Sequence, residues 1–204
     1  MPIELLLKAV TAGVLASLAC GLGALPLLWR RLDPKAHTGL GYGFAGGLMF
    51  AASVYNLILP ALNLTDHQWT LGYVAPVLVG MLLGSAFLGL TNRYLHAHPQ
   101  SLTTTSRWGG RVGLLIFLAM SVHSIPEGVA VGTAYTAGEV QNSDLGAYIA
   151  LAIAIHNIPE GLAVAIPLRS AGAGIGWCFT AAFLTSLPQP IAAIPAVLAA
   201  WAFN

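Results

Sequence analysis

Two short segments of the sequence place a histidine four residues before a glutamate inside apolar surroundings. They are identical at seven of ten positions and read HSIPEGVAVG at 123–132 and HNIPEGLAVA at 156–165. The paired residues are His123 with Glu127 and His156 with Glu160. An ionised carboxylate at the centre of a bilayer costs roughly 2.5–3.5 kcal/mol. These segments therefore need a compensating partner, and a bound cation is the simplest one.

The types of donor atom indicate which cation would bind. Imidazole combined with carboxylate suits Zn²⁺ and other divalent first-row metals, whereas Mg²⁺ and Ca²⁺ prefer shells made only of oxygen. Residues four apart on a helix project from one face, so each segment offers one nitrogen and one oxygen. Two such helices facing each other in opposite directions predict a His₂Glu₂ site. Thiolates, which structural zinc sites usually recruit, are not expected here, because Cys20 and Cys178 are interpreted as small apolar fillers.

The residues between and after these ligands favour a path for ions. Pro126 and Pro159 each remove a backbone donor and loosen the helix, which predicts a route for water or ions beside the site. Gly128 and Gly161 allow close approach of a neighbouring helix or of a moving ion. Two neighbouring carboxylates repel each other when no cation is bound, so exchange of a metal ion for protons is a natural hypothesis.

The whole composition is that of a membrane protein with several spans. Of 204 residues, 57% are hydrophobic and 7% are charged, and the mean hydropathy is +0.78. We predict an all-α transmembrane bundle forming one domain over 1–204. Its helices are expected at about 9–29, 38–62, 71–92, 112–135, 146–168 and 175–203. A net charge of +1 without a basic stripe argues against a nucleic-acid partner.

The positive charges predict how the chain lies in the bilayer. Seven of its eight Lys and Arg residues fall on one side of the predicted spans, and only Lys8 falls on the other. Because positively charged short loops stay in the cytoplasm, the N-terminus is expected outside and 94–111 is expected to be a cytoplasmic polar loop. His96 and His98 in this loop are interpreted as solvated residues. The expected location is the plasma membrane or an inner membrane.

At the two HxxPEG segments the chain resembles the ZIP (Zrt/Irt-like) family of divalent metal transporters, whose fourth and fifth helices carry such motifs. The resemblance extends over all six predicted spans. It implies metal ligation by His123, Glu127, His156 and Glu160 and transport toward the cytosol. By the same resemblance Asn157 and Gln189 are expected in the metal site. The divalent cation is then a substrate, and no resident cofactor is expected.

The chain differs from the family pattern in three respects. Ser124 stands where many members have Asn, and Gln189 stands where many have Glu before a proline. Both are weaker, neutral ligands, so the sequence does not decide whether a second metal ion binds beside the first. The family has eight helices, of which the last two have no counterpart here, and these pack with the second and third helices as a scaffold. The chain is therefore either a fragment or relies on self-association, as in a homodimer. In the second span, Ser53 and Asn56 either line the route or bond a neighbouring helix.

Two other classes of function could use histidines within a membrane. In a membrane cytochrome, His123 and His156 would be the axial ligands of one haem, but the paired carboxylates would then have no role. In an intramembrane metallohydrolase, a zinc ion would activate water with a Glu as base. HxxPEG differs from the HExxH spacing of such enzymes, and no further nucleophile stands beside it.

Overall fold

The computed structural model describes residues 2–28, 38–52, 54, 58, 71–97 and 108–203, and its regular structure is helical throughout. Ser53, Asn56 and residues 98–107 of the predicted polar loop lie outside this description. The elements are α1 (Pro2–Leu22), η1 (Leu25–Leu28), α2 (Thr38–Ala52), α4 (Leu71–Ala97), α6 (Gly110–Val140), α7 (Leu145–Ser170), α8 (Ile175–Ser186) and α9 (Pro188–Ala202). The predicted all-α class is confirmed.

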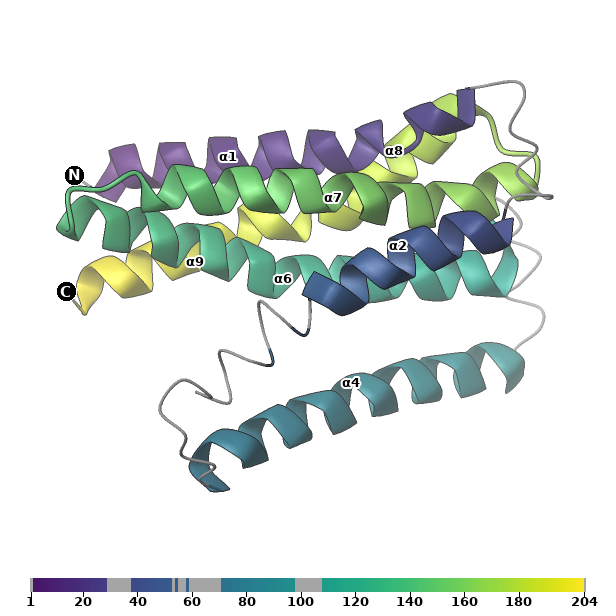
Figure 1. Cartoon of the computed structure of the whole chain (residues 1–204), viewed down its shortest axis with the longest axis horizontal. Coiled ribbons are helices and arrows are strands. Elements are labelled where there is room, and N and C mark those ends of the chain that lie inside the picture. Colours follow the sequence, from purple (N-terminus) through teal and green to yellow (C-terminus); the bar gives the residue numbers. More distant parts are fainter. Residues whose placement is uncertain are drawn as a thin grey trace.

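The centre of the molecule is a bundle of α1, α6, α7 and the consecutive pair α8 and α9 (Figure 1). In this bundle α1 runs parallel to α7, while α6 runs antiparallel to α7 and parallel to α8 and α9 (Figure 1). Helix α2 packs against α7. Both chain termini lie at the same end of the bundle (Figure 1).

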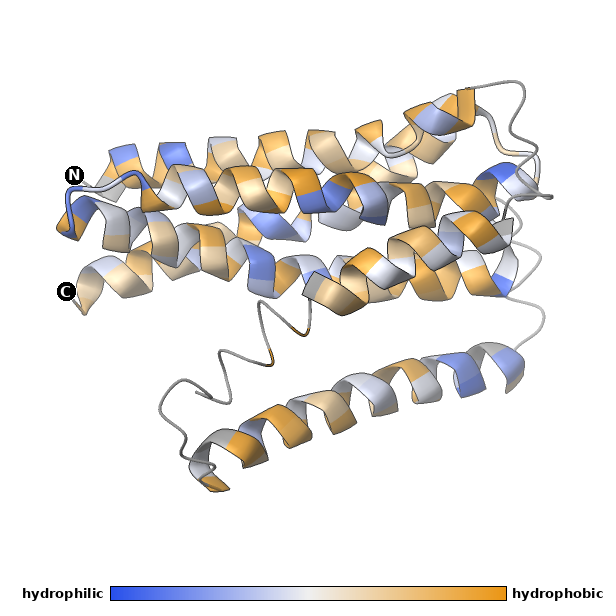
Figure 2. Cartoon of the chain, in the orientation of Figure 1, coloured by the Kyte–Doolittle hydropathy of each residue, from blue (hydrophilic) through white to orange (hydrophobic). Residues whose placement is uncertain are grey.

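Five helical segments of the described chain are long and apolar enough to cross a membrane. They are Ile3–Leu28, Val74–Tyr94, Gly110–Val140, Leu145–Ser170 and Ile175–Ala202. The described part of the predicted 38–62 span is the shorter α2. Many large apolar side chains of the described helices are exposed, and polar residues gather near several helix ends (Figure 2), as expected for a bilayer environment.

The sixth predicted span, 175–203, forms one membrane-crossing segment over Ile175–Ala202, but its helical hydrogen-bond ladder is interrupted near the middle. Helix α8 ends at Ser186 and α9 begins at Pro188, with Leu187 between them. Pro188 and Pro190 have no backbone N–H, so the carbonyls of Leu184 and Ser186 lose their usual helical donors. The Leu184 carbonyl accepts from the Leu187 N–H instead, at 3.3 Å.

The motif helices, by contrast, stay continuous. Helix α6 runs through Pro126 and helix α7 runs through Pro159 and Pro167. The loosening expected at Pro126 and Pro159 therefore does not break either helix, because a single proline removes only one hydrogen bond of the ladder.

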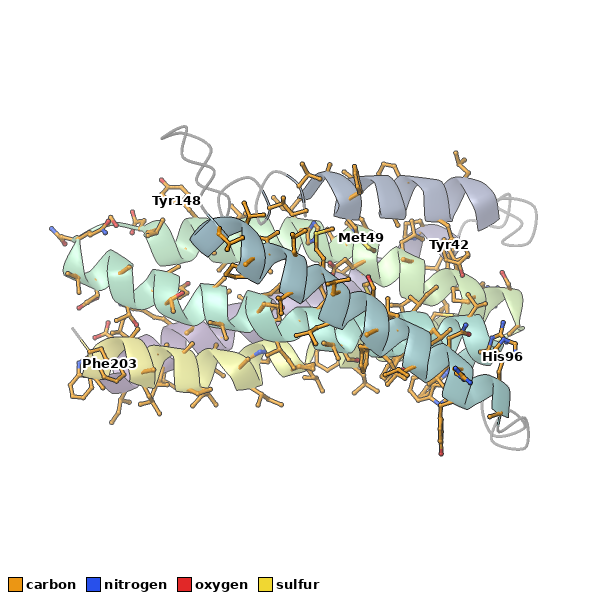
Figure 3. All side chains as sticks on the ribbon, turned by 90° about the horizontal axis from the view of Figure 1, so that it is seen from below. Tyr42, Met49, His96, Tyr148 and Phe203 are labelled. Atoms are coloured by element: carbon orange, nitrogen blue, oxygen red, sulfur yellow. The ribbon has the colours of Figure 1, made fainter. Side chains whose placement is uncertain are left out.

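Helix α4 lies apart from the tightly packed bundle, and no residue of its most apolar stretch is buried. Figure 3 shows it across one face of the molecule, with the labelled His96 toward its C-terminal end. The His96 imidazole contacts the guanidinium of Arg111, which joins the end of α4 to the start of α6. His96 is exposed as predicted, but it lies in the last turn of α4 and not in a loop, because the helix continues to Ala97, beyond the predicted end of the span at 92.

Candidate metal centre

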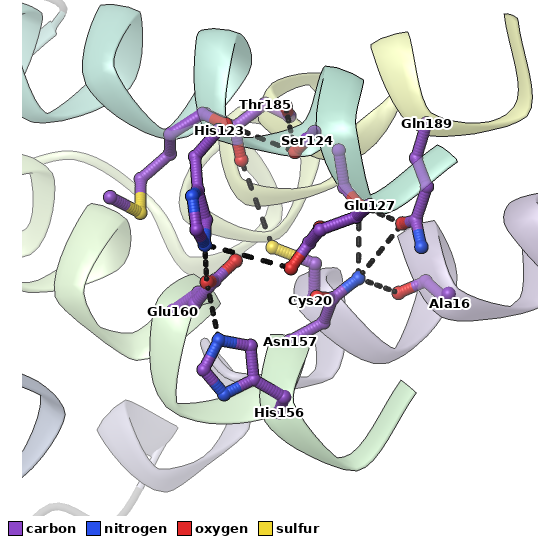
Figure 4. A network of polar contacts seen from close by, with 12 residues as sticks. Ala16, Cys20, His123, Ser124, Glu127, His156, Asn157, Glu160, Thr185 and Gln189 are labelled. Atoms are coloured by element: carbon purple, nitrogen blue, oxygen red, sulfur yellow. Dashed lines mark hydrogen bonds and ion pairs between the residues drawn. The ribbon is translucent and has the colours of Figure 1, made fainter. Parts of the chain in front are cut away.

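The four residues singled out by spacing meet between α6 and α7. His123 and Glu127 lie one turn apart on α6, and His156 and Glu160 lie one turn apart on α7. Each of them has a ligand atom within 4.8 Å of a ligand atom of every other one. Figure 4 shows the four side chains converging from the two antiparallel helices. The predicted His₂Glu₂ arrangement is thus present as a cluster of side chains.

Glu160 holds the central place in this cluster. Its Oε1 atom lies 3.0 Å from Nε2 of His156 and 3.3 Å from Nε2 of His123. The Glu127 carboxylate is farther away, with Oε1 3.7 Å from Nε2 of His123. One carboxylate oxygen therefore bridges the two imidazoles, whose ring centroids are 6.3 Å apart.

The carboxylates are buried while the imidazoles remain partly accessible. Side-chain exposure is 2% for Glu160 and 9% for Glu127, against 29% for His123 and 22% for His156. Oε2 of Glu127 has no hydrogen-bond partner, whereas Oε1 of Glu160 has the two imidazole nitrogens beside it. A buried acceptor without a partner is costly, and a cation bound between the four side chains would compensate Oε2 of Glu127.

The glycine after each glutamate serves helix packing. A Cβ atom on Gly128 would meet the Gln189 carbonyl oxygen of α9, and one on Gly161 would meet the Cys20 carbonyl oxygen of α1. Of the two roles considered for these glycines, the structure supports close approach of a neighbouring helix. Backbone contact of this kind is common where helices associate in lipid.

A second, uncharged network adjoins the four residues. The Asn157 amide nitrogen, with two hydrogens to donate, lies 3.1 Å from each of three acceptors: the carbonyl oxygen of Ala16, Oγ of Ser186 and Oε1 of Gln189. The Ser186 hydroxyl donates to the same Gln189 oxygen at 3.0 Å. The Gln189 oxygen is thus occupied by two donors, whereas Oδ1 of Asn157 has none.

This network includes residues that the sequence did not single out. Ser17 of α1 is fully buried, and its hydroxyl lies 2.9 Å from the carbonyl oxygens of both Gly13 and Ser186. Cys20 has its sulfur 3.7 Å from the Thr185 hydroxyl, and Cys178 lies in an apolar cluster. The only available signal for Ser17 was a hydroxyl in an apolar span, which is common and unspecific.

The geometry also bears on the cytochrome alternative. An iron atom shared by His123 and His156 would have to lie between their imidazoles. That position holds Oε1 of Glu160, which is within 3.3 Å of both Nε2 atoms. The arrangement favours a small cation bound jointly by nitrogen and carboxylate oxygen over a haem.

Comparison with known proteins identifies the family. Residues 91–202 match the family described as ZIP Zinc transporter. The chain is 36% identical over 195 residues to the zinc transporter GufA of Myxococcus xanthus, covering 93% of this chain and 75% of the relative. It is 35% identical over 187 residues to a putative zinc transporter of Arabidopsis thaliana. It is also 36% identical over 122 residues to the zinc transporter ZupT of Escherichia fergusonii.

The lengths of these relatives differ from that of the chain. The match covers 28% of the Arabidopsis protein and 46% of the Escherichia protein. The Myxococcus protein is matched over three quarters of its length, and the family match alone spans the two motif helices and the interrupted sixth span. On these grounds the chain belongs to the ZIP zinc transporter family, whose members are multi-pass membrane proteins and transporters rather than enzymes.

Proposed function

We propose that this chain carries divalent transition-metal ions across a cell membrane, zinc foremost, through the site formed by His123, Glu127, His156 and Glu160. The observation that carries the proposal is the convergence of these four donors between α6 and α7. Membership of a zinc transporter family supports it independently.

The donor set accounts for the expected range of substrates. Two imidazole nitrogens and two carboxylate oxygens suit Zn²⁺ and admit Fe²⁺, Mn²⁺ and Cd²⁺. The absence of thiolate from this set of four favours an affinity that permits release, because the closed thiolate sites of structural zinc hold the ion permanently. The partly exposed imidazoles offer first contact to a hydrated ion, and the buried carboxylates then replace its water.

Transport in this proposal runs toward the cytosol by alternating access. The site is exposed to one side of the membrane at a time while the ion stays bound near mid-span. In the empty state Glu127 and Glu160 repel each other, so protons returning on these carboxylates would complete the cycle.

Asn157 and Gln189 are proposed as flanking residues of the same site. The free Oδ1 of Asn157 can join the ligand shell without loss of the hydrogen bonds made by its nitrogen. A ligand role for Gln189 would require its oxygen to leave the Asn157 and Ser186 donors. A homodimer also stays a proposal, which native mass spectrometry in detergent can check.

Uptake into proteoliposomes tests the function. Wild-type protein under an inward gradient should accumulate Zn²⁺, and parallel assays with Fe²⁺, Mn²⁺ and Cd²⁺ would rank the substrates. Glu127→Gln and His156→Ala should each lower zinc uptake by at least about ten-fold, since loss even of residues supporting a metal ligand costs that much. Glu139→Gln is the matched control, because Glu139 lies exposed on the same helix outside the cluster. Wild-type uptake rates in both site variants would contradict the assignment, and absence of uptake by the wild type would contradict the function.

A further inference from the structure

The interruption of the sixth span lies beside the metal centre and receives polar side chains from three other helices. The Ser124 hydroxyl of α6 donates to the Thr185 carbonyl oxygen at 3.0 Å. Asn157 of α7 donates to the Ser186 hydroxyl, and Ser17 of α1 donates to the Ser186 carbonyl oxygen. Asn157 also donates to Oε1 of Gln189. We call Thr185, Ser186 and Gln189, whose oxygen atoms accept these bonds, the polar junction.

The proline pattern explains why the junction can accept these donors. Pro190 has no N–H to offer the Ser186 carbonyl, so this oxygen is free for the hydroxyl of Ser17. The junction is buried, with exposures of 0–1% for Ser17, Ser124, Asn157, Thr185, Ser186 and Gln189. Water does not reach these buried acceptors. Removing a donor side chain would therefore leave its acceptor without a hydrogen bond, which is costly.

Two of the residues that donate to the polar junction, Ser124 and Asn157, occupy the same position in the two motifs. Ser124 directly follows His123, and Asn157 directly follows His156. On a helix, neighbouring residues point about 100° apart, so a histidine can face the metal centre while the next residue faces α8 and α9. Figure 4 shows Ser124 and Asn157 reaching away from the imidazoles toward Thr185 and Gln189, respectively.

We propose that Ser17 and Ser124, together with the amide nitrogen of Asn157, are positioning residues that fix both ligand helices to the polar junction and thereby set the affinity for zinc. This inference rests on the proposed function. The donor atoms of a zinc ion must all lie about 2.0–2.2 Å from one point. Because α6 and α7 carry half of the donors each, a small displacement of one helix relative to the other moves two donors at once. Tethering both helices to one fixed point limits that displacement and opposes the mutual repulsion of the two carboxylates.

Ser121 supplies a matched control for Ser124. The Ser121 hydroxyl bonds the Phe117 carbonyl four residues back on α6, as the Ser124 hydroxyl bonds that of Met120. Only Ser124 also bonds another helix. Ser121→Ala and Ser124→Ala therefore delete the same atom and the same local contact, while only Ser124→Ala removes a contact with another helix, from a fully buried position.

The experiment measures zinc dissociation constants of purified, folded protein by competition with a chromophoric chelator. Ser124→Ala should raise the constant by about three- to ten-fold, the equivalent of one buried hydrogen bond, while Ser121→Ala leaves it unchanged. Ser17→Ala reaches the junction from α1 and should act in the same direction. The Ser17→Ala/Ser124→Ala double variant should show a smaller loss than the product of the single losses, because both residues hold one junction.

Each outcome distinguishes this role from plain structural support. Lower yield or thermal stability with an unchanged dissociation constant in the folded fraction would overturn the proposal. If the Ser124→Ala variant does not fold, the zinc dissociation constant of folded Ser17→Ala decides whether the positioning role holds. A wild type that neither binds nor transports zinc would refute the proposed function, whereas a zinc-transporting wild type with unaltered affinity in both variants would refute only the positioning role.

Discussion

The two glutamates are alike in sequence but unequal in position. Glu160 places one oxygen between both imidazoles, while Glu127 approaches only that of His123. We expect Glu160→Gln to weaken zinc binding more than Glu127→Gln, with each change costing at least about ten-fold. Competition titration of the two purified variants would measure this difference. The opposite order would mean that the ion sits nearer α6 than the bridging geometry indicates.

The four central residues could be predicted from the sequence because helix geometry alone relates them in pairs. A four-residue spacing puts His123 on the same face as Glu127, and the repeated motif puts the second pair on the next helix. Ser17 could not be found in this way. Its acceptor is the Ser186 carbonyl, 169 residues away, and that oxygen is free only because Pro190 lacks an N–H.

At the scale of whole helices, the glycines after the motif glutamates determine how closely their neighbours pack. A methyl group on Gly161 would collide with backbone atoms of Cys20, which cannot move without shifting α1. Gly161→Ala should therefore lower the free energy of unfolding by about 1–3 kcal/mol, as overpacking does elsewhere. Gly84→Ala on α4 is the control, because nothing lies within 4 Å of its added Cβ.

Thermal unfolding in detergent, followed by tryptophan fluorescence, would compare these two glycine variants. The control should match the wild type or exceed it slightly, since alanine favours helix by up to about 1 kcal/mol over glycine. Equal destabilisation by both substitutions would show that the loss of stability does not come from the contact between α1 and α7.

The interruption of the sixth span shows how far hydropathy can predict a helix. Hydropathy sees one apolar stretch over Ile175–Ala202, and its length fits a single crossing. Pro188 and Pro190 remove two donors that would serve the same turn, so the hydrogen-bond ladder is interrupted there, while Leu187 keeps helical backbone angles. Pro126 and Pro159 each remove only one nearby donor, and their helices continue. Two prolines within one turn interrupt the helix, whereas a single proline does not. A hydropathy average contains no information on proline spacing and therefore does not predict the difference.

For the whole molecule, zinc should act as a stabilising ligand. An ion that binds only the folded state adds about 2.7 kcal/mol of stability at a free concentration 100 times its dissociation constant. The melting temperature should therefore rise with added zinc and fall again when a chelator removes it. His156→Ala should abolish this rise, whereas Glu139→Gln should retain it. A rise of equal size in His156→Ala would place the stabilising ion at another site.

The charges at the two ends of the molecule predict its orientation in the membrane. In the described chain, Arg111 at the start of α6 and Arg169 at the end of α7 lie at one end, while Glu139 and Asp144 flank the α6–α7 turn at the other. Both termini lie at the acidic end (Figure 1). Because arginine-rich loops remain in the cytoplasm, the end with Arg111 and Arg169 should face the cytoplasm. The acidic end with both termini should then face outward.

Epitope tags on intact cells test that orientation. Tags at the N-terminus and the C-terminus should both bind antibody without permeabilisation, whereas a tag inserted between residues 98 and 107 should bind only after it. Labelling of all three in permeabilised cells controls for folding and expression. If the inserted tag alone were labelled on intact cells, the molecule would be inverted. That result would contradict the predicted orientation.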